Sequence, residues 1–181
     1  MANATIAPSL PIIGKAFSHV KNYDLLVKLM VTIPGLMIAL SAPFIGWLLD
    51  RFGRKKILLL GLVIYGLAGT SGLYLNELHT LLAGRAILGL AGAATMTTAT
   101  TLIGDYFKGD ERNRFMGFQA AAMAFAGTLL VFSGGVLADL HWRYPFAIFG
   151  IAFLIAPFAA IWIFEPPKSE NPIILKNNTR I

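Results

Sequence analysis

The sequence predicts an all-α membrane protein, a bundle of apolar helices that crosses a lipid bilayer. Its 181 residues are 56% hydrophobic and 13% charged, whereas soluble domains average about 25% charged residues. The few charges fall between long apolar runs and not along them, although a helix in water needs charged side chains along its exposed face. We therefore expect lipid to surround most of the helices.

Five apolar stretches are each long enough to cross the hydrocarbon core, whose thickness of about 30 Å takes roughly 20 helical residues. They are approximately residues 28–49, 57–75, 81–104, 115–138 and 144–164. Residues 1–14 have the same apolar character, but a helix of this length reaches only about 21 Å and cannot span. We expect them to be the end of an incomplete first helix, so that residues 1–164 form a transmembrane bundle of five full helices and one truncated helix.

The composition changes to polar and proline-rich in residues 165–181, where Pro166, Pro167 and Pro172 lie close together. Such a composition is typical of a linker and not of another transmembrane helix. We therefore expect a tail, or the start of a linker to a second bundle, since many transporters consist of two parallel halves.

The distribution of Lys and Arg predicts the orientation, because basic residues concentrate in cytoplasmic loops. Ten lie on one side of the predicted membrane, in residues 51–56, residues 108–114 and the tail. Four lie on the other side: Lys15, Lys21, Lys28 and Arg143. We expect a multi-pass protein of the plasma (inner) membrane with the first group in the cytoplasm. The net charge of +6 then reflects topology, and we do not expect nucleic acid as a partner.

Residues that carry catalytic or metal chemistry are scarce. The sequence has no cysteine, and His19, His79 and His141 occur singly, without a second histidine at helical metal-binding spacing. It contains no phosphate-binding loop, dinucleotide glycine pattern or serine nucleophile motif. We therefore expect no enzyme, no catalytic residue, no metal site and no cofactor.

The most specific local pattern is Gly-Trp-Leu-Leu-Asp-Arg-Phe-Gly-Arg-Lys-Lys over residues 46–56. Gly46 has no side chain, so another helix can approach it closely, and Gly53 can adopt the backbone angles of a short reversal. The charge of Asp50 opposes the dipole at the carboxyl end of its helix, so it needs a basic residue or a helix amino end as partner. A solvated basic loop explains the basic residues but not the placement of the glycines and the aspartate, and we favour a gate.

This segment closely resembles the loop signature of the major facilitator superfamily. Residues 85–89 (Arg-Ala-Ile-Leu-Gly) and residues 142–146 (Trp-Arg-Tyr-Pro-Phe) resemble the same family, so the resemblance extends over nearly the whole chain. It implies one six-helix half of a transporter that moves a small organic solute by alternating access, with efflux favoured over uptake. It also implies that the loop latches two halves together, with Asp105 as a second acidic residue and Arg112 able to join the network. The predicted gating residues are Gly46, Asp50, Arg51, Gly53, Arg54, Asp105 and Arg112.

Arg85 is the one charged residue well inside an apolar run, which makes it a candidate for function. It lies roughly 6 Å from the outer end of its helix, so its guanidinium could instead extend to the membrane interface. Small and weakly polar side chains continue its helical face, and a second such face lies on the following helix. All of them also fit ordinary contacts between helices. The predicted cavity residues are Asn3, Thr5, Arg85, Met96, Thr100, Gln119 and Met123.

Two features weaken the assignment as a drug–proton antiporter. Leu130 and Val131 stand where such members of the family commonly carry a glycine and a proline before a paired glycine. No aspartate or glutamate lies deep in an apolar run, so a proton-coupling carboxylate is expected elsewhere. The expected partners are a small solute, the lipid bilayer, and a second six-helix half or a second copy of the chain. The alternative is a membrane interaction protein, or the remnant of a transporter, that moves no solute.

Overall fold

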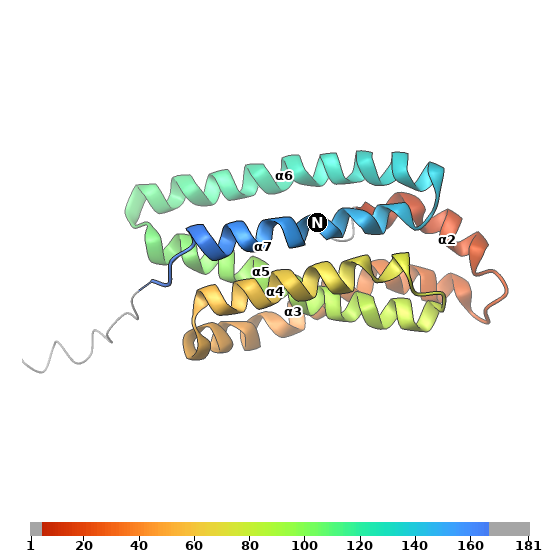
Figure 1. The fold of residues 1–181 in the computed structure, drawn as a ribbon, viewed down its shortest axis with the longest axis horizontal. Helices are drawn as coiled ribbons and strands as arrows, with labels where there is room; N and C mark the ends of the chain where they lie inside the picture. The colour runs from red at the N-terminus through yellow and green to blue at the C-terminus, as the bar shows by residue number, and fades with distance from the viewer. Residues whose placement is uncertain (1–4, 167–181) are drawn as a thin grey trace, which may run out of the picture.

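The computed structural model describes residues 5–166, and every regular element within this range is a helix. The long helices run side by side along one axis (Figure 1). In chain order the elements are η1 (Ala7–Ser9), α2 (Leu10–Ala16), α3 (Tyr23–Phe52), α4 (Arg54–Gly69), η2 (Thr70–Leu73), α5 (Leu78–Tyr106), α6 (Gly109–Leu140), η3 (Tyr144–Gly150) and α7 (Ile151–Trp162). Five segments are long and apolar enough to cross a membrane: Tyr23–Phe52, Arg54–Leu73, Leu78–Tyr106, Gly109–Leu140 and Tyr144–Trp162. The predicted all-α membrane bundle is therefore confirmed.

Some helices differ in detail from the apolar stretches that predict them. Helix α6 begins at Gly109 and not near residue 115, because Asp110 and Glu111 occupy its first turn, where negative charge is favourable. The last span begins as the 3-10 helix η3, with Pro145 in its first turn, and continues as α7. The charged first turn thus extends α6 beyond its apolar segment.

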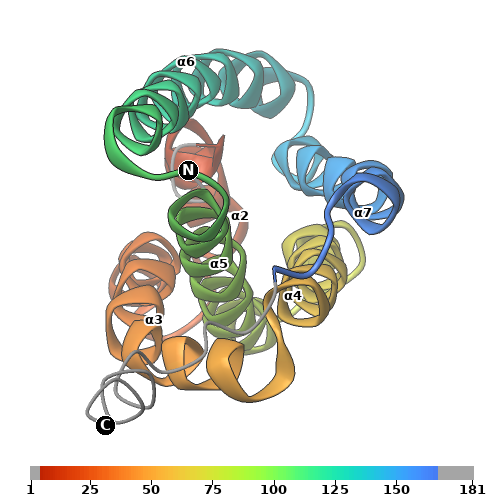
Figure 2. The same cartoon turned by 90° about the vertical axis from the view of Figure 1, so that its left-hand side faces the viewer.

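Helix α5 lies at the centre of the bundle, with α3 and α4 packed against it (Figure 2). Glycines allow these close approaches. A Cβ atom at Gly89 would lie 2.6 Å from the carbonyl oxygen of Pro34 in α3, and one at Gly61 would lie 3.1 Å from the Cβ of Ala94. Small residues at such crossings let helix backbones come together, as is usual for helices in lipid.

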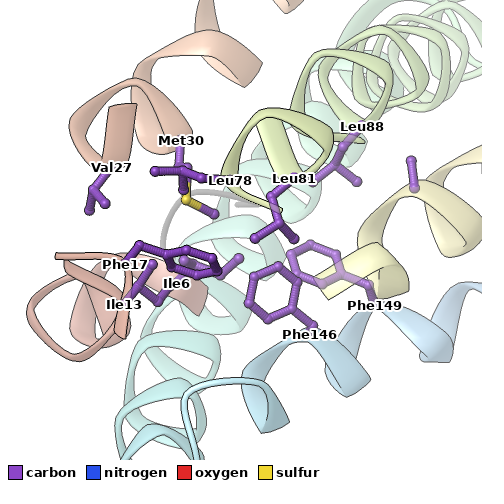
Figure 3. Packing of buried hydrophobic residues seen from close by; sticks show 11 residues of the cluster. Ile6, Ile13, Phe17, Val27, Met30, Leu78, Leu81, Leu88, Phe146 and Phe149 are labelled. Atoms are coloured by element: carbon purple, nitrogen blue, oxygen red, sulfur yellow. The ribbon is translucent and has the colours of Figure 1, made fainter. Parts of the chain in front are cut away.

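The largest apolar core lies at the end of the bundle where α2 and η3 meet α5. Phe146 and Phe149 of η3 point toward Leu81 of α5, and the cluster also contains Ile13 of α2 and Phe17, which follows α2 (Figure 3). Four of these five side chains are at most 4% exposed, and Phe17 is 6% exposed. The core therefore fixes η3 against the face of α5 that also carries Arg85.

Helix α6 is the least covered of the spans. Only 6% of its most apolar window is buried, against 44% in Arg54–Leu73 and in α5. It contacts η3 and the start of the described chain, where a Cβ at Gly134 would collide with the backbone of Thr5. Figure 2 shows α6 set apart from α4, and side chains of α6 line two cavities.

Candidate functional site

Arg54, the first residue of α4, joins the ends of three helices. Its Nε donates to Asp105 Oδ2 at 3.0 Å near the end of α5, and its Nη2 lies 3.3 Å from Asp50 Oδ1 near the end of α3. The side chain of Arg54 is 17% exposed, that of Asp105 29% and that of Asp50 75%. Because solvent screens exposed pairs more effectively, the contact with Asp105 is the stronger of the two.

The backbone between α3 and α4 turns at a single residue, Gly53, whose φ of 95° favours glycine. The turn leaves the first N–H groups of α4 without partners inside their own helix. Glu165, after the end of α7, supplies the missing acceptors. Its Oε1 accepts the N–H of Arg54 at 2.6 Å, and its Oε2 accepts the N–H of Lys55 at 2.8 Å.

We call Asp50, Arg54, Asp105 and Glu165 the loop-end cluster. A second contact holds the same ends together, because the hydroxyl of Tyr106 donates to the carbonyl of Phe164. The rings of these two residues also stack with centroids 4.5 Å apart. The ends of α3, α4, α5 and α7 are thereby tied at one end of the bundle.

The remaining predicted gating residues lie beside this cluster without joining it. The guanidinium of Arg51 lies over the rings of Trp47 and Phe52, 5.3 Å and 5.6 Å from their centroids. Arg112 forms no ion pair within residues 5–166 and lies next to Gly104, where a Cβ would be 3.6 Å from its Nε. A Cβ at Gly46 would meet nothing within 4 Å among the described atoms. The surface at Gly46 is thus open.

A cavity of about 430 Å³ lies between α5 and α6, and three predicted residues, Met96, Gln119 and Met123, line it. We call it the Gln119 cavity. The Nε2 of Gln119 donates to the hydroxyl of Thr100 at 3.2 Å, so a fourth predicted residue is tied to the same wall. An amide, a hydroxyl and two thioethers in an apolar wall are suited to a small organic solute.

A second cavity of about 570 Å³ adjoins the first, and Tyr65 and Thr95 line both. We call it the Phe149 cavity. The predicted residue Thr5 lines it, together with Ser133 and Phe149. Sequence reasoning did not select Tyr65, although a phenol hydroxyl in the middle of an apolar helix was a usable signal. Asn3 lies outside the described residues.

Arg85 lies behind the wall of the Phe149 cavity and lines neither cavity. Its guanidinium carbon is 4.6 Å from the ring centroid of Phe146 and 5.3 Å from that of Phe149. The residue is only 1% exposed, so its side chain does not extend to the membrane interface. Within residues 5–166, its buried Nε and Nη2 have no hydrogen-bond partner, an arrangement that costs free energy.

The comparison with known families agrees with this architecture. A family model described as Major Facilitator Superfamily matches residues 1–178. The chain belongs to this superfamily. The resemblance inferred from residues 46–56 is therefore confirmed, and the family is one of transporters and not of enzymes. Its five spanning helices make the chain a multi-pass membrane protein.

Curated relatives include exporters and solute transporters. The chain is 33% identical over 153 residues to the bacillibactin exporter of Bacillus subtilis. The matched region covers 81% of this chain and 37% of that protein. It is 35% identical over 156 residues to the niacin transporter NiaP of Acinetobacter baylyi, with 84% and 34% covered. It is 29% identical over 152 residues to the quinolone resistance protein NorB of Staphylococcus aureus, with 83% and 32% covered. The chain thus spans roughly a third of the length of each of these relatives.

Proposed function

We propose that this chain is one half of a transporter in the plasma membrane that exports a small organic solute by alternating access. The observation that supports this most directly is the separation of two sites on the same helices. Asp105 is tied to Arg54 at the end of α5, whereas Met96 lines the Gln119 cavity nine residues earlier. That separation is about 14 Å along the helix, so the cluster acts on the ends of the helices and not on the solute.

The loop-end cluster acts as the gate in this proposal. When the Gly53 ends of the helices are close together, Arg54 holds Asp105 and Asp50, and Glu165 holds the start of α4. All these contacts lie within this half, so they fix its helix ends as one surface, and the exposed carboxylate of Asp50 can face the second half when the two halves close at this end. A partly exposed ion pair across that closure contributes about 0.2–1 kcal/mol, which changes the populations of two states of similar free energy.

The two cavities form the solute site in this proposal. Their walls are mostly apolar, with the Gln119 amide, the Tyr65 phenol and threonine hydroxyls as polar groups. Such walls suit amphipathic organic molecules of varied shape. Efflux is favoured because relatives named as a bacillibactin exporter and as quinolone and tetracycline resistance proteins are among the matches. A second six-helix half, or a second copy of the chain, completes the transporter.

The test is transport in proteoliposomes that contain this chain alone or together with a second six-helix half. The probe is ethidium, an amphipathic dye whose movement is followed by fluorescence. Movement that requires the second half and falls in Gln119→Leu and Met123→Ala supports the proposal. Absence of movement in both preparations, with the helices intact by circular dichroism, favours the alternative of a membrane interaction protein.

A further inference from the structure

The end of the bundle opposite the loop-end cluster carries a pocket that the proposed transport cycle does not use. The pocket has a volume of about 500 Å³ and lies between α2 and the first turns of α3. We call it the α2–α3 pocket. Its charged lining residues are Lys15, Asp24 and Lys28, and Leu10, Tyr23 and Val27 form apolar parts of its wall.

The pocket has an excess of positive charge. The Nζ of Lys28 lies 2.7 Å from Oδ2 of Asp24, and the two side chains are 70% and 71% exposed. Lys15, in the last turn of α2, adds a second ammonium group that Asp24 does not neutralise through any ion pair in the described chain. The tendency of basic residues to concentrate in cytoplasmic loops does not explain these lysines. Lys15 and Lys28 are among the four basic residues predicted on the opposite side of the membrane.

The apolar wall defines the rest of the ligand. The ring of Tyr23 lies beside Gly14, where a Cβ would be 3.9 Å from the Tyr23 Cε2, so the ring and α2 lie close together in the wall of the pocket. Tyr23 itself is 36% exposed. An aromatic or aliphatic body can pack on this ring while an anionic group reaches the lysines.

We propose that the α2–α3 pocket binds an amphipathic organic anion, such as an aromatic carboxylate, on the face opposite the loop-end cluster. With the orientation predicted from the basic residues, this face is outside the cytoplasm. Binding requires only α2 and α3, so it can be measured without transport. A negative result here leaves the ethidium experiment unaffected.

The test uses the purified chain in phosphatidylcholine nanodiscs, with benzoate as probe and neutral benzamide as its charge control, measured by isothermal titration. We expect saturable binding of benzoate and at least tenfold weaker binding of benzamide. Lys15→Gln and Lys28→Gln should each weaken benzoate binding by about two- to fivefold, as expected for exposed charge pairs. Lys21→Gln is the matched control, because Lys21 is in the same loop region but does not line the pocket, and it should bind like the parent.

Asp24→Asn provides a result of opposite sign. It removes the carboxylate that competes for Lys28, so benzoate binding should strengthen. Equal binding of benzoate and benzamide, no binding of either, or an equal loss in Lys21→Gln and Lys15→Gln would overturn the proposal. In phosphatidylglycerol nanodiscs, a loss of benzoate affinity that disappears in Lys15→Gln would assign the pocket to a lipid headgroup and overturn the solute assignment.

Discussion

The carboxylate of Glu165 accepts the backbone N–H of Arg54 at 2.6 Å, although 111 residues separate the two in the chain. This contact joins the segment that follows α7 to the start of α4. It resembles a helix N-cap that is supplied from a distant segment, since the carboxylate also interacts favourably with the positive end of the helix dipole. Glu165 is thus a structural partner of the predicted gating loop.

Glu165→Ala should lower the stability of the chain by about 0.5–2 kcal/mol, the usual cost of losing an N-cap acceptor. Glu165→Gln should lose less, because one amide oxygen still accepts. The measurement is the thermal unfolding midpoint in detergent micelles. Glu77→Ala is the control, since Glu77 lies at the N-cap position of α5 but forms no side-chain capping bond. Equal losses at the two positions would contradict the capping role.

The second prediction concerns the two carboxylates that face Arg54. A double-mutant cycle with Arg54→Gln and Asp105→Asn should give a coupling energy of about 1 kcal/mol, and the cycle with Asp50→Asn should give less than about 0.5 kcal/mol. The reason is exposure, because Asp105 is 29% exposed and Asp50 75%. Thermal unfolding of the single and double variants measures both. A larger coupling to Asp50 would contradict this ranking.

In the complete transporter, Asp50→Asn should lower the rate of transport while leaving solute binding largely intact. Asp50 is a group at the helix ends and lines neither cavity, so its loss changes the balance of states and not the solute contacts. Flux and binding of the same probe should be measured side by side. Unchanged flux in Asp50→Asn would remove Asp50 from the gate.

Another prediction follows from the buried guanidinium of Arg85. Arg85→Met should raise the unfolding midpoint or leave it unchanged, because it removes a desolvated charge and keeps an apolar chain of similar length. Arg143→Met is the matched control. Arg143 donates to the carbonyl of Leu73 at 3.1 Å and to the side chain of Asn76 at 2.5 Å, so its loss should lower the midpoint. A larger loss in Arg85→Met than in Arg143→Met would show that the rings of Phe146 and Phe149 more than compensate for burial of the guanidinium.

The sequence was sufficient for the bundle itself, because membrane spans depend on length and hydropathy, which need no tertiary information. Helix ends were harder to place. Asp110 and Glu111 lie outside the apolar stretch but inside α6, since a charged first turn is favourable to a helix that leaves the bilayer. The 3-10 form of η3 depends on how Phe146 and Phe149 pack against α5, and hydropathy does not reveal such packing.

Some residues of the candidate site could be predicted from the sequence, and others could not. The loop pattern predicted a basic partner for Asp50, and the family resemblance added Asp105; the structure places both carboxylates beside Arg54. Glu165 was missed because a single acidic residue after an apolar run has no periodic pattern, and its partners are backbone groups far along the chain. The position of Arg85 behind Phe149 depends on η3 folding over α5, which one helical face cannot predict.

A further prediction concerns orientation. In this cysteine-free sequence, Lys55→Cys and Asn113→Cys should resist an impermeant thiol reagent that is added outside intact cells, because the basic loops are expected in the cytoplasm. Lys21→Cys lies between α2 and α3, at the opposite end of the bundle, and should react. Permeabilised cells give the control for accessibility. The reverse labelling pattern would reverse the predicted topology.

The last prediction compares two glycines that differ in what surrounds them. A Cβ at Gly46 would meet nothing within 4 Å, whereas one at Gly89 would lie 2.6 Å from the Pro34 carbonyl oxygen. In the isolated chain, Gly46→Leu should therefore leave the unfolding midpoint unchanged or raise it, since leucine favours a helix by up to about 1 kcal/mol over glycine. Gly89→Ala should lower it, because α3 and α5 must separate.

In the assembled transporter, Gly46→Leu should have a strong effect, although it should not destabilise the isolated chain. If a helix of a second half packs on the open surface at Gly46, leucine there occupies the space that this helix needs. Gly46→Leu should then abolish ethidium flux while the chain remains folded, and Gly46→Ala should reduce it less. The readouts are flux in proteoliposomes and association of the two halves by co-purification. Full flux in Gly46→Leu would mean that no helix approaches this surface during the cycle, and the gate would then require a different contact between the halves.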